Sequence, residues 1–562
     1  MNKFKYAIIA IVSVFVITLS VVPVSGQTND NNNFEIAKNL DIYTTLFKEL
    51  NKNYVDEISP GDLMEKGIDA MLESLDPYTV FIPESEAEDY KFITTGQYGG
   101  VGALIQQQGD RIVVAEPYEG DPAQKAGIKA GDVILEIDGK PVNGKTTGEV
   151  SAVLKGQPGT PVKIKFLREG TEEPFEKKLV RENVRVENIP YFGMIRDHIG
   201  YIKLVSFTQD AAREVKEAFV NLKTNNELHG LILDLRGNGG GLLQEAVDIT
   251  NIFVDKGTLV VSTKGKLANK NYSYKTNNAA VDREIPLVVL VDNSSASASE
   301  IVAGAIQDID RGIILGQRTF GKGLVQNVVP LTYNSSVKIT VAKYYIPSGR
   351  CIQAIDYSKK NENGDSEAIP DSLISAFKTR NGRTVFDGVG IDPDIKMEPE
   401  KLSAVSFALF SKYHFFNFAT RFEREHPGIA PATDFEITDE IYQQFLDYVS
   451  DKDYSYITKC EEALEQLKKN AQEEKYFEDI SKEYRLLAEK LKERKEGDIL
   501  KHKEEIKKIL KVEIVSRYYY LKGEIMASLA DDPEIDQSVD ILNERDSYLA
   551  ILDGSVKNES KQ

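Results

Sequence analysis

The spacing of hydrophobic residues predicts helices at the start of the folded chain. Apolar side chains recur every three to four positions between residues 41 and 74, which is the period of an amphipathic helix. Ser59-Pro60-Gly61 interrupts the pattern, because proline and glycine break helices. We therefore expect a helical region over residues 41–90. Residues 27–40 are polar and predict a linker without a drive to fold.

A different pattern, short strands between Gly and Pro turns, runs from residue 91 to 182. Strand-like runs lie at 112–115, 133–137 and 162–167. Residues 121–127 indicate a short helix, with proline near its start and glycine at its end. This region therefore predicts a compact module of short strands.

Between residues 183 and 400 buried strands alternate with helices. The run 230–235 leads through a glycine-rich turn to an amphipathic stretch at 242–253. A second run, 286–291, leads through small residues to another helical stretch at 301–309. Such alternation predicts an α/β core. Taken with the other regions, it gives a multidomain protein of the α/β (α+β) class.

The last region, residues 401–562, changes composition again. Residues 456–511 are rich in Glu, Lys and Leu, which is typical of charged amphipathic helices. We expect helical hairpins that pack on the core. An arm that binds an adaptor or a second copy of the chain is the alternative.

Residues 1–26 have the pattern of a signal peptide. Lys3 and Lys5 precede a nearly continuous apolar run, and small residues at 24–26 offer a cleavage point. An uncleaved anchor is the alternative, because the apolar run approaches membrane-spanning length. In either case we expect export to the periplasm or cell envelope. Membrane attachment is expected only if this segment stays uncleaved.

Composition narrows the classes of function. A chain of 562 residues exceeds one hydrophobic core, so several domains are expected. The formal net charge of −19 argues against nucleic acid as the main ligand, because phosphate binding needs a basic face. Cys351 and Cys460 support neither a disulfide framework nor a zinc site. We expect both to be packing residues, and a single bridge between them stays open.

Ser297 has two interpretations. It lies in the segment 292–300, between a buried strand and a helix, where N–H groups at the helix start can hold an oxyanion. Ser297-x-x-Glu300 also has the spacing of a capping box, and taken alone the segment favours a cap. None of the five histidines lies in a motif that places it beside a nucleophile. A Ser-His-Asp triad therefore stays open but is not indicated.

Lys322 lies in a glycine-flanked loop, 316–323, with the spacing of a phosphate-binding loop. The nucleotide interpretation fails, because Gly323 replaces the Mg²⁺-binding hydroxyl and 324–329 predicts a strand where a helix is needed. A lysine can instead act as the general base for a serine. Its ordinary pKa is about 10.4, so burial must first make it neutral. Gln326 can then orient the amine.

These segments resemble the carboxyl-terminal processing proteases, also called tail-specific proteases. The matching motifs are Ser-Ala-Ser-Ala-Ser-Glu at 295–300, Gln307-Asp308, Thr-Phe-Gly-Lys-Gly at 319–323 and Gln326. The resemblance implies that Ser297 is the nucleophile, Lys322 the general base and Gln326 the residue that positions the lysine. Asp308 matches an acid with a catalytic role in some members and a structural role in others. We treat it as a supporting acid.

The resemblance extends over roughly residues 40–400 and implies a crotonase-like protease core. The segment 233–241, Leu-Asp-Leu-Arg-Gly-Asn-Gly-Gly-Gly, is similar to the family's glycine turn. It implies an oxyanion hole formed by the backbone N–H of Ala298 and that of Gly239 or Gly240.

Residues 91–182 resemble a PDZ domain inserted before that core. Its carboxylate-binding loop would be Gly99-Gly100-Val101-Gly102, followed by an edge strand. A C-terminal peptide would add to this edge as a strand, with its carboxylate held by N–H groups of the loop.

We therefore expect an exported serine endopeptidase whose PDZ domain captures unfolded or tail-bearing proteins and whose Ser297/Lys322 dyad cuts them. No metal and no organic cofactor is expected. The alternative is a non-catalytic PDZ scaffold in the envelope. We also expect the empty PDZ domain to hold the dyad inactive until a tail binds.

Overall fold

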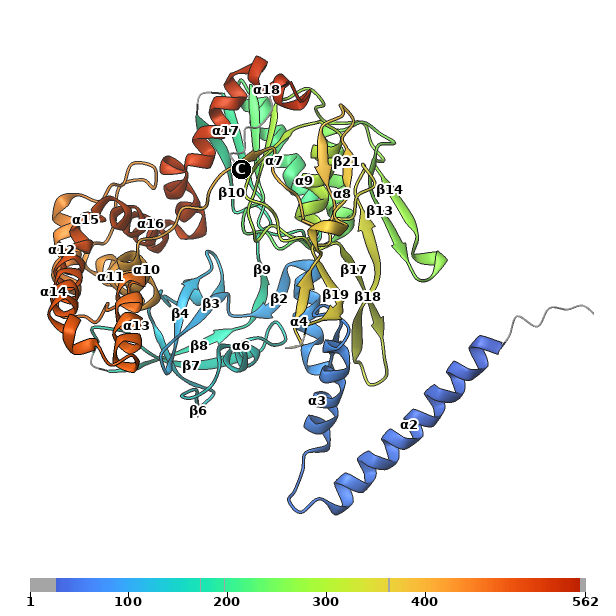
Figure 1. The fold of residues 1–562 in the computed structure, drawn as a ribbon, viewed down its shortest axis with the longest axis horizontal. Helices are drawn as coiled ribbons and strands as arrows, with labels where there is room; N and C mark the ends of the chain where they lie inside the picture. The colour runs from blue at the N-terminus through green and yellow to red at the C-terminus, as the bar shows by residue number, and fades with distance from the viewer. Residues whose placement is uncertain (1–26, 172, 197, 362–363, 556–562) are drawn as a thin grey trace, which may run out of the picture. The chain divides into compact units, whose positions relative to one another are not determined.

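The computed structural model (Figure 1) describes residues 27–171, 173–196, 198–361 and 364–555. The predicted signal segment, residues 1–26, lies outside these described residues. Within the described part of the chain, no helix is both long and apolar enough to span a membrane. The chain divides into two compact units, one that ends at Pro77 and one that begins at Tyr78.

The first unit contains α2 (Gln27–Asn53) and α3 (Pro60–Glu73). Ser59 caps α3 and Pro60 lies in its first turn, which confirms the predicted break. The prediction of a linker at 27–40 is wrong, because α2 already begins at its first residue. The second half of that stretch contains Glu, Ala, Lys and Leu, which favour helix and extend α2 through the polar residues.

A six-stranded sheet forms the centre of the second unit. In spatial order its strands are β10 (Tyr191–Arg196), β11 (Ile199–Lys203), β12 (Gly230–Asp234), β15 (Leu287–Val291), β16 (Ile313–Gly316) and β23 (Ile395–Lys396). β10 is antiparallel to β11, and the other neighbours are parallel. Helices α8 (Leu243–Phe253) and α9 (Ala298–Asp308) follow β12 and β15. The predicted α/β core is therefore confirmed.

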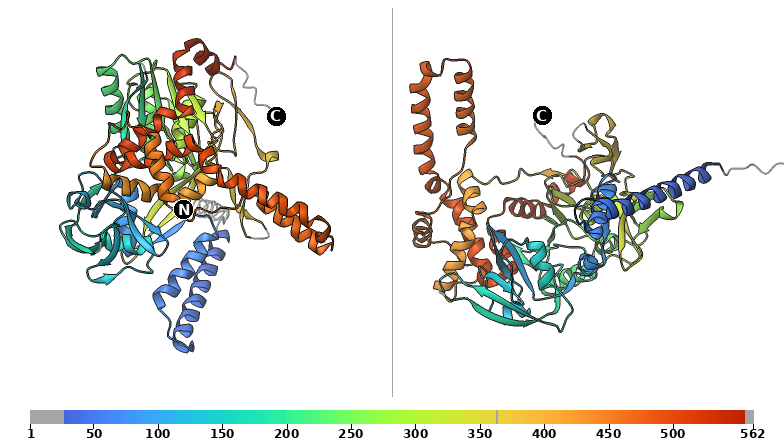
Figure 2. Two further views of the ribbon diagram at one scale, coloured as in Figure 1. Left: turned by 90° about the vertical axis from the view of Figure 1, so that its left-hand side faces the viewer. Right: turned by 90° about the horizontal axis from the view of Figure 1, so that it is seen from below.

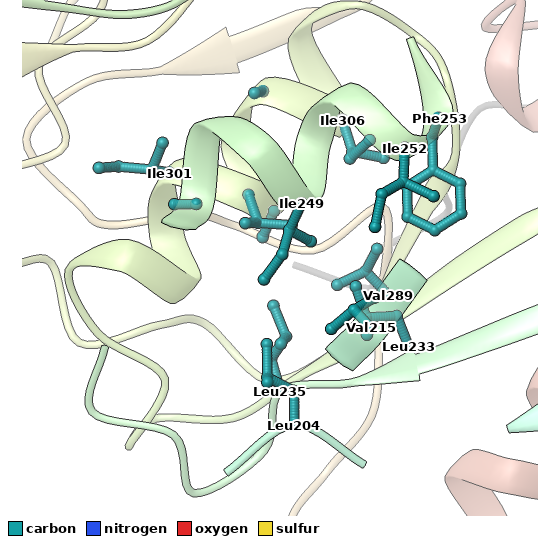
Figure 3. Packing of buried hydrophobic residues seen from close by; sticks show 14 of the residues in the cluster. Leu204, Val215, Leu233, Leu235, Ile249, Ile252, Phe253, Val289, Ile301 and Ile306 are labelled. Atoms are coloured by element: carbon teal, nitrogen blue, oxygen red, sulfur yellow. The ribbon is translucent and has the colours of Figure 1, made fainter. Parts of the chain in front are cut away.

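Helices cover both faces of this sheet. On one face, α7 (Ala211–Asn225), α8 and α9 share a buried cluster with Leu233 (Figure 3). On the other face, Ile232 shares a cluster with α17 (Pro533–Asn543) and α18 (Arg545–Leu552). Successive strand residues point to opposite faces, which is why these two neighbours join different clusters. The last two helices thus pack on the core and complete it.

A second, antiparallel sheet belongs to the same unit. Its strands are β1 (Val80–Ile82), β18 (Ser336–Tyr345), β13 (Leu259–Gly265), β14 (Tyr272–Lys275) and β17 (Leu324–Pro330). β17 begins two residues after Lys322, which confirms the predicted strand at 324–329. The helix start that a phosphate-binding loop needs is therefore absent at this position.

Short elements complete the second unit. They are α4 (Ala87–Thr95), the strand pairs β2 (Gln97–Gly100) with β9 (Glu182–Arg185), β19 (Ile355–Lys360) with β20 (Ser366–Ala368) and β21 (Ala376–Lys378) with β22 (Thr384–Phe386), and the 3₁₀ turns η1 (Glu84–Glu86), η2 (Ala268–Lys270), η3 (Asp371–Leu373) and η4 (Leu529–Asp531).

The module between β2 and β9 is a separate sheet with its own buried cluster. Its strands are β3 (Ala103–Gln108), β4 (Arg111–Pro117), β5 (Val133–Ile137), β7 (Pro161–Leu167) and β8 (Phe175–Val180), with β6 (Lys140–Pro141) paired to β5. Its helices are α5 (Pro122–Lys125) and α6 (Thr147–Leu154). β3 has a partner strand on one side only and is an edge strand.

The region after residue 400 is helical, as expected. Five helices share one buried cluster: α10 (Ala404–Ser411), α11 (His414–Glu425), α12 (Asp439–Val449), α15 (Asp498–Lys501) and α16 (Lys503–Ser528). Two more, α13 (Lys459–Glu473) and α14 (Phe477–Glu496), run side by side as a hairpin (Figure 2). Both cysteines are unpaired. Cys460 is exposed on α13, so the prediction that it is a packing residue is wrong.

Candidate active site

Ser297 stands at the start of α9, in the turn that follows β15. Its backbone has φ 55° and ψ −110°, whereas helix-capping residues are normally extended. A side chain held at such a positive φ costs about 1–3 kcal/mol of strain. The turn is fixed by Asp292, whose carboxylate accepts the N–H groups of Gly237 and Ser295. Ser297 therefore does not have the conformation of a typical cap.

The glycine turn after β12 lies against Ser297. A Cβ on Gly240 would lie 2.9 Å from the Cβ of Ser297, so only glycine fits at this position. The N–H of Gly240 donates to Oδ1 of Asn238 at 2.9 Å. The N–H groups of Gly239 and Ala298 have no hydrogen-bond partner among the described residues. Of the two glycines predicted for the oxyanion hole, Gly239 is the one whose N–H is available.

Lys322 lies in the loop between β16 and β17. Its Nζ is 4.0 Å from the ring centroid of Tyr78, within the range of a cation–π contact. The hydroxyl of Tyr78 lies 3.2 Å from that of Tyr357, which holds the ring in place. The lysine amine thus rests against an ordered aromatic ring.

One cleft of about 560 Å³ brings most of the predicted residues together. Its lining includes Ser297, Lys322, Gln326, Gly239 and Gly240. The amide of Gln326 donates to the hydroxyl of Thr340 at 3.2 Å. A cleft of this volume is in the usual range for sites that hold small ligands. The serine, the lysine and the glycine turn therefore face one common space.

Glu300 connects the loop of Ser297 to the loop of Lys322, a role that the sequence did not reveal. Its fully buried carboxylate accepts the N–H of Ser297 at 2.8 Å and the N–H of Lys322 at 2.9 Å. It also accepts the N–H of Gly321 at 2.7 Å and the hydroxyl of Thr319 at 2.6 Å. Burial raises the pKa of Glu300 to about 7, although these hydrogen bonds oppose the shift. Its spacing from Ser297 had suggested only a helix cap.

Tyr344 links the same two loops a second time. Its hydroxyl lies 3.1 Å from the carbonyl oxygen of Ser297 and also reaches the carbonyl oxygen of Lys322. The side chain is buried, and burial raises its pKa well above the ordinary value. The phenol therefore stays protonated and can act as a hydrogen-bond donor to these carbonyls.

Asp308 lies at the far end of α9 and does not line the cleft. Ten helical steps from Ala298 correspond to about 15 Å. Its carboxylate forms a buried ion pair with Arg350 at 2.9 Å and accepts the N–H of Ser348 at 2.9 Å. Burial raises the pKa of Asp308, and Arg350 opposes the shift. This position fits a supporting role.

Arg236 joins the glycine turn to the end of the chain. It forms an ion pair with Asp234 at 2.7 Å, and its other arm contacts Asp532 at 2.7 Å and Glu534 at 2.8 Å. Burial disfavours the charge of Asp234, but Arg236 and Lys203 outweigh it and lower the pKa of Asp234. The start of α17 thus holds the segment that leads into the glycine turn.

The predicted carboxylate-binding loop leads directly into the edge strand β3. The carbonyls of Val101 and Gly102 accept the N–H groups of Ala123 and Tyr118. The N–H groups of Val101 and Gly102 have no hydrogen-bond partner in the part of the chain that the structure describes. Gly102 has φ 71°, and a Cβ there would lie 2.2 Å from Asp121. The loop can therefore present N–H groups to an anion, and α6 packs against the adjacent strand β3.

All five histidines are described, and none lines the cleft. One group of described residues has donor atoms close enough to hold a metal ion, within 4.8 Å of one another. It consists of His198, Glu227 and His229, all exposed. Its members are also absent from the lining of the cleft.

Comparisons with known proteins match three segments of the chain. A family model described as peptidase family S41 matches residues 198–359. A model of the PDZ domain matches residues 99–179. A third, described as the C-terminal helical domain of a probable PDZ-protease, matches residues 405–542. The matches and the observed elements confirm the mixed α/β architecture with a PDZ domain and a helical C-terminal domain.

Two relatives align over most of their own lengths. A carboxy-terminal-processing protease of Bartonella bacilliformis is 36% identical over 342 residues, which cover 60% of this chain and 78% of the relative. The carboxy-terminal processing protease CtpA of Bacillus subtilis is 30% identical over 437 residues, which cover 75% of this chain and 89% of the relative. The solved structure of a photosystem II D1 C-terminal processing protease is 29% identical, with a TM-score of 0.35 over 64% of this chain and 93% of that chain.

Proposed function

Because the chain belongs to peptidase family S41, among the carboxy-terminal processing proteases, we propose that it cleaves protein tails with a Ser297/Lys322 dyad. It is a serine-type peptidase that carries a PDZ domain. The observation that best supports the dyad is the shared cleft. A strained serine and a lysine line it, and one buried carboxylate, that of Glu300, connects their two loops.

The chemistry follows from the positions of these groups. In its unprotonated form, the amine of Lys322 takes the hydroxyl proton as Oγ of Ser297 attacks the scissile carbonyl carbon. The N–H groups of Gly239 and Ala298 stabilise the oxyanion that forms. Lys322 then gives the proton to the leaving amine, and an acyl-enzyme remains on Ser297. Water, deprotonated by the same amine, releases the acid and regenerates the serine.

Alanine variants of the two residues test the dyad. Ser297→Ala and Lys322→Ala should each abolish degradation of an unfolded protein with an apolar C-terminus, while far-UV circular dichroism stays unchanged. Lys343→Ala, which alters an exposed lysine on β18, is the matched control and should retain activity. Full activity of folded Lys322→Ala would mean that another base acts, and the lysine assignment would be abandoned.

We further propose that the PDZ domain binds substrate tails at the loop 99–102 and that this binding releases the dyad. The support is a short covalent path. Tyr90, Phe92 and Thr94 of α4 line the catalytic cleft. α4 ends at Thr95, and its C-cap Gly96 leads immediately into β2 and the loop. A change in the loop can therefore reach the cleft wall within a few residues.

Release of the dyad by tail binding can be tested with a separately added peptide. A peptide with a free apolar C-terminus that is not itself cut should accelerate turnover of a short chromogenic substrate that lacks a tail. The same peptide with an amidated C-terminus is the control and should not. If the rate is the same with the free-carboxylate peptide, with the amidated peptide and without any peptide, tail-dependent release of the dyad would be excluded.

We also propose that the protein is exported and processes or degrades envelope proteins. The support is the sequence pattern of residues 1–26, which resembles a signal peptide. Fusion of residues 1–40 to a reporter that is active only outside the cytoplasm tests export. An inactive fusion with intact reporter protein in the cytoplasm would contradict it.

A further inference from the structure

The C-terminal helical domain contacts the PDZ domain directly. The hydroxyl of Tyr413 donates to the carbonyl oxygen of Gln107 at 2.8 Å. On the neighbouring strand, Glu116 accepts the N–H of Leu521 at 3.0 Å. Lys129 also forms an ion pair with a carboxylate of α11 at 2.6 Å. Several separate contacts therefore hold the two domains together, and one of them falls on the edge strand β3.

The contact at Gln107 lies on the edge where a tail would add. In an antiparallel pair, residues alternate between those whose backbone groups face the partner strand and those whose groups face away. The carbonyl of Gln107 receives Tyr413, so it faces the free edge of β3. The register against β4 shifts between Leu104 and Ile105, but the extra residue lies on β4, so β3 keeps its own alternation. The backbone groups of Ala103 and Ile105 therefore also face the free edge. No other strand pairs with this edge in the part of the chain that the structure describes.

We propose that Tyr413 is a specificity-determining residue, which limits the tail that can pair with β3 to about four residues. This inference rests on the proposed recognition of tails by the PDZ domain. A tail whose carboxylate lies at Val101 and Gly102 runs along β3 and pairs first with Ala103, then with Ile105. Each of these positions accounts for two tail residues. The next pairing position is Gln107, where the phenol of Tyr413 already occupies the carbonyl.

Tyr413 is held firmly in this position. It precedes α11, whose Phe415 and Phe418 are buried in the core of the helical domain. The residues on both sides of it bind the same loop: Lys412 pairs with Asp453 at 2.8 Å, and His414 contacts the carbonyl of Asp453 at 2.9 Å. A longer tail would have to displace an anchored turn. We therefore expect tails to leave the sheet edge at about the fifth residue from the C-terminus.

Peptide binding to the full chain tests this inference. Fluorescence polarisation with Ser297→Ala protein, which should not cut its ligand, compares apolar peptides of four, six and eight residues with free or amidated C-termini. Protein that retains Tyr413 should bind peptides of the three lengths with affinities within about twofold of one another, because pairing stops at Gln107. Tyr413→Gly should bind the six- and eight-residue peptides about fivefold more tightly than the four-residue one, since about one further backbone hydrogen bond forms.

Glycine is chosen because Tyr413 has φ 61°, which glycine adopts without strain. Tyr476→Gly changes a half-exposed tyrosine between α13 and α14 and is the control; it should leave the length dependence unchanged. Circular dichroism and thermal unfolding show whether each variant is folded. If Tyr413→Gly is unstable, Tyr413→Asn, which also tolerates positive φ, replaces it.

The outcomes separate this inference from the proposal on which it rests. Carboxylate-dependent binding with no gain for long peptides in Tyr413→Gly would overturn the role of Tyr413 alone. A wild-type protein that already prefers eight residues to four would do the same. Equal binding of free and amidated peptides, or no binding at all, would overturn tail recognition by the PDZ domain. The proposed limit of about four paired residues would then fall as well.

Discussion

Replacing Glu300 by glutamine breaks the link between the Ser297 loop and the Lys322 loop with little change in side-chain volume. Each carboxylate oxygen accepts two hydrogen bonds, from Thr319 and Gly321 on one side and from Ser297 and Lys322 on the other. An amide has one oxygen, so its NH₂ group must face two of these donors. A buried donor without an acceptor costs about 1–3 kcal/mol. Removal of the buried charge offsets part of this cost. The free energy of unfolding should therefore decrease by about 2 kcal/mol.

The same substitution should slow catalysis more than it weakens substrate binding. If the loss of about 2 kcal/mol falls on the alignment of Ser297 and Lys322, kcat decreases about 30-fold. Steady-state kinetics on a quenched fluorescent peptide at pH 8 should give that decrease with KM changed less than about threefold. Glu284→Gln, at an exposed glutamate, is the control. A folded Glu300→Gln enzyme with wild-type kcat, or a loss confined to KM, would refute the positioning role.

The pH dependence provides an independent check on Glu300. Burial raises its pKa to about 7 from the ordinary 4.5. Its contribution to stability is therefore fully present below pH 4.5 and is lost as pH rises through 7, about 3 kcal/mol in all. Protonation also puts an O–H group among four donors, so wild-type kcat should fall as pH drops through 7. An acid limb that persists unchanged in Glu300→Gln would contradict this assignment.

Three other changes have defined outcomes. Ser297→Gly should raise the free energy of unfolding by about 1 kcal/mol in urea, because glycine tolerates φ 55°; a decrease of about 1 kcal/mol would instead indicate a lost cap. Asp308→Asn should cost about 3–5 kcal/mol by the same assay, because it leaves buried Arg350 without its counter-charge, and a change below about 1 kcal/mol would contradict the ion pair's role. Deletion of residues 533–555 should expose the sheet face around Ile232, so dye binding to apolar surface should rise and cooperative unfolding should be lost; unchanged unfolding would contradict the packing of α17 and α18 on that face.

Local patterns together with the family resemblance predicted three of the residues that line the cleft, Ser297, Lys322 and Gln326. Ser297 and Lys322 lie in loops that follow the buried strands β15 and β16, and parallel strands bring such loops to one edge. Gln326 lies on strand β17. The strand after Lys322 could be predicted from its β-branched residues alone, which was enough to reject a nucleotide site. The fold class followed in the same way from alternating strands and helices.

Interactions between distant parts of the chain could not be predicted in this way. Arg236 finds Asp532 and Glu534 almost 300 positions later, and no local spacing marks such a pair. Glu300 lies in a pattern that two roles share, and only the position of the lysine loop decides between them. The helix at residues 27–40 was missed because a run of Asn and Asp has low helix propensity, which is a weak guide to structure.

The central claim, that Lys322 activates Ser297, is tested most directly by labelling the serine itself. A fluorophosphonate probe reacts with an activated serine. Mass spectrometry of the labelled peptide identifies the labelled residue, and a time course gives the rate of labelling. The account predicts labelling at Ser297 in the wild type and at least about 100-fold slower labelling in Lys322→Ala, the usual contribution of a general base. Labelling of Ser297 at the same rate in both proteins would contradict it.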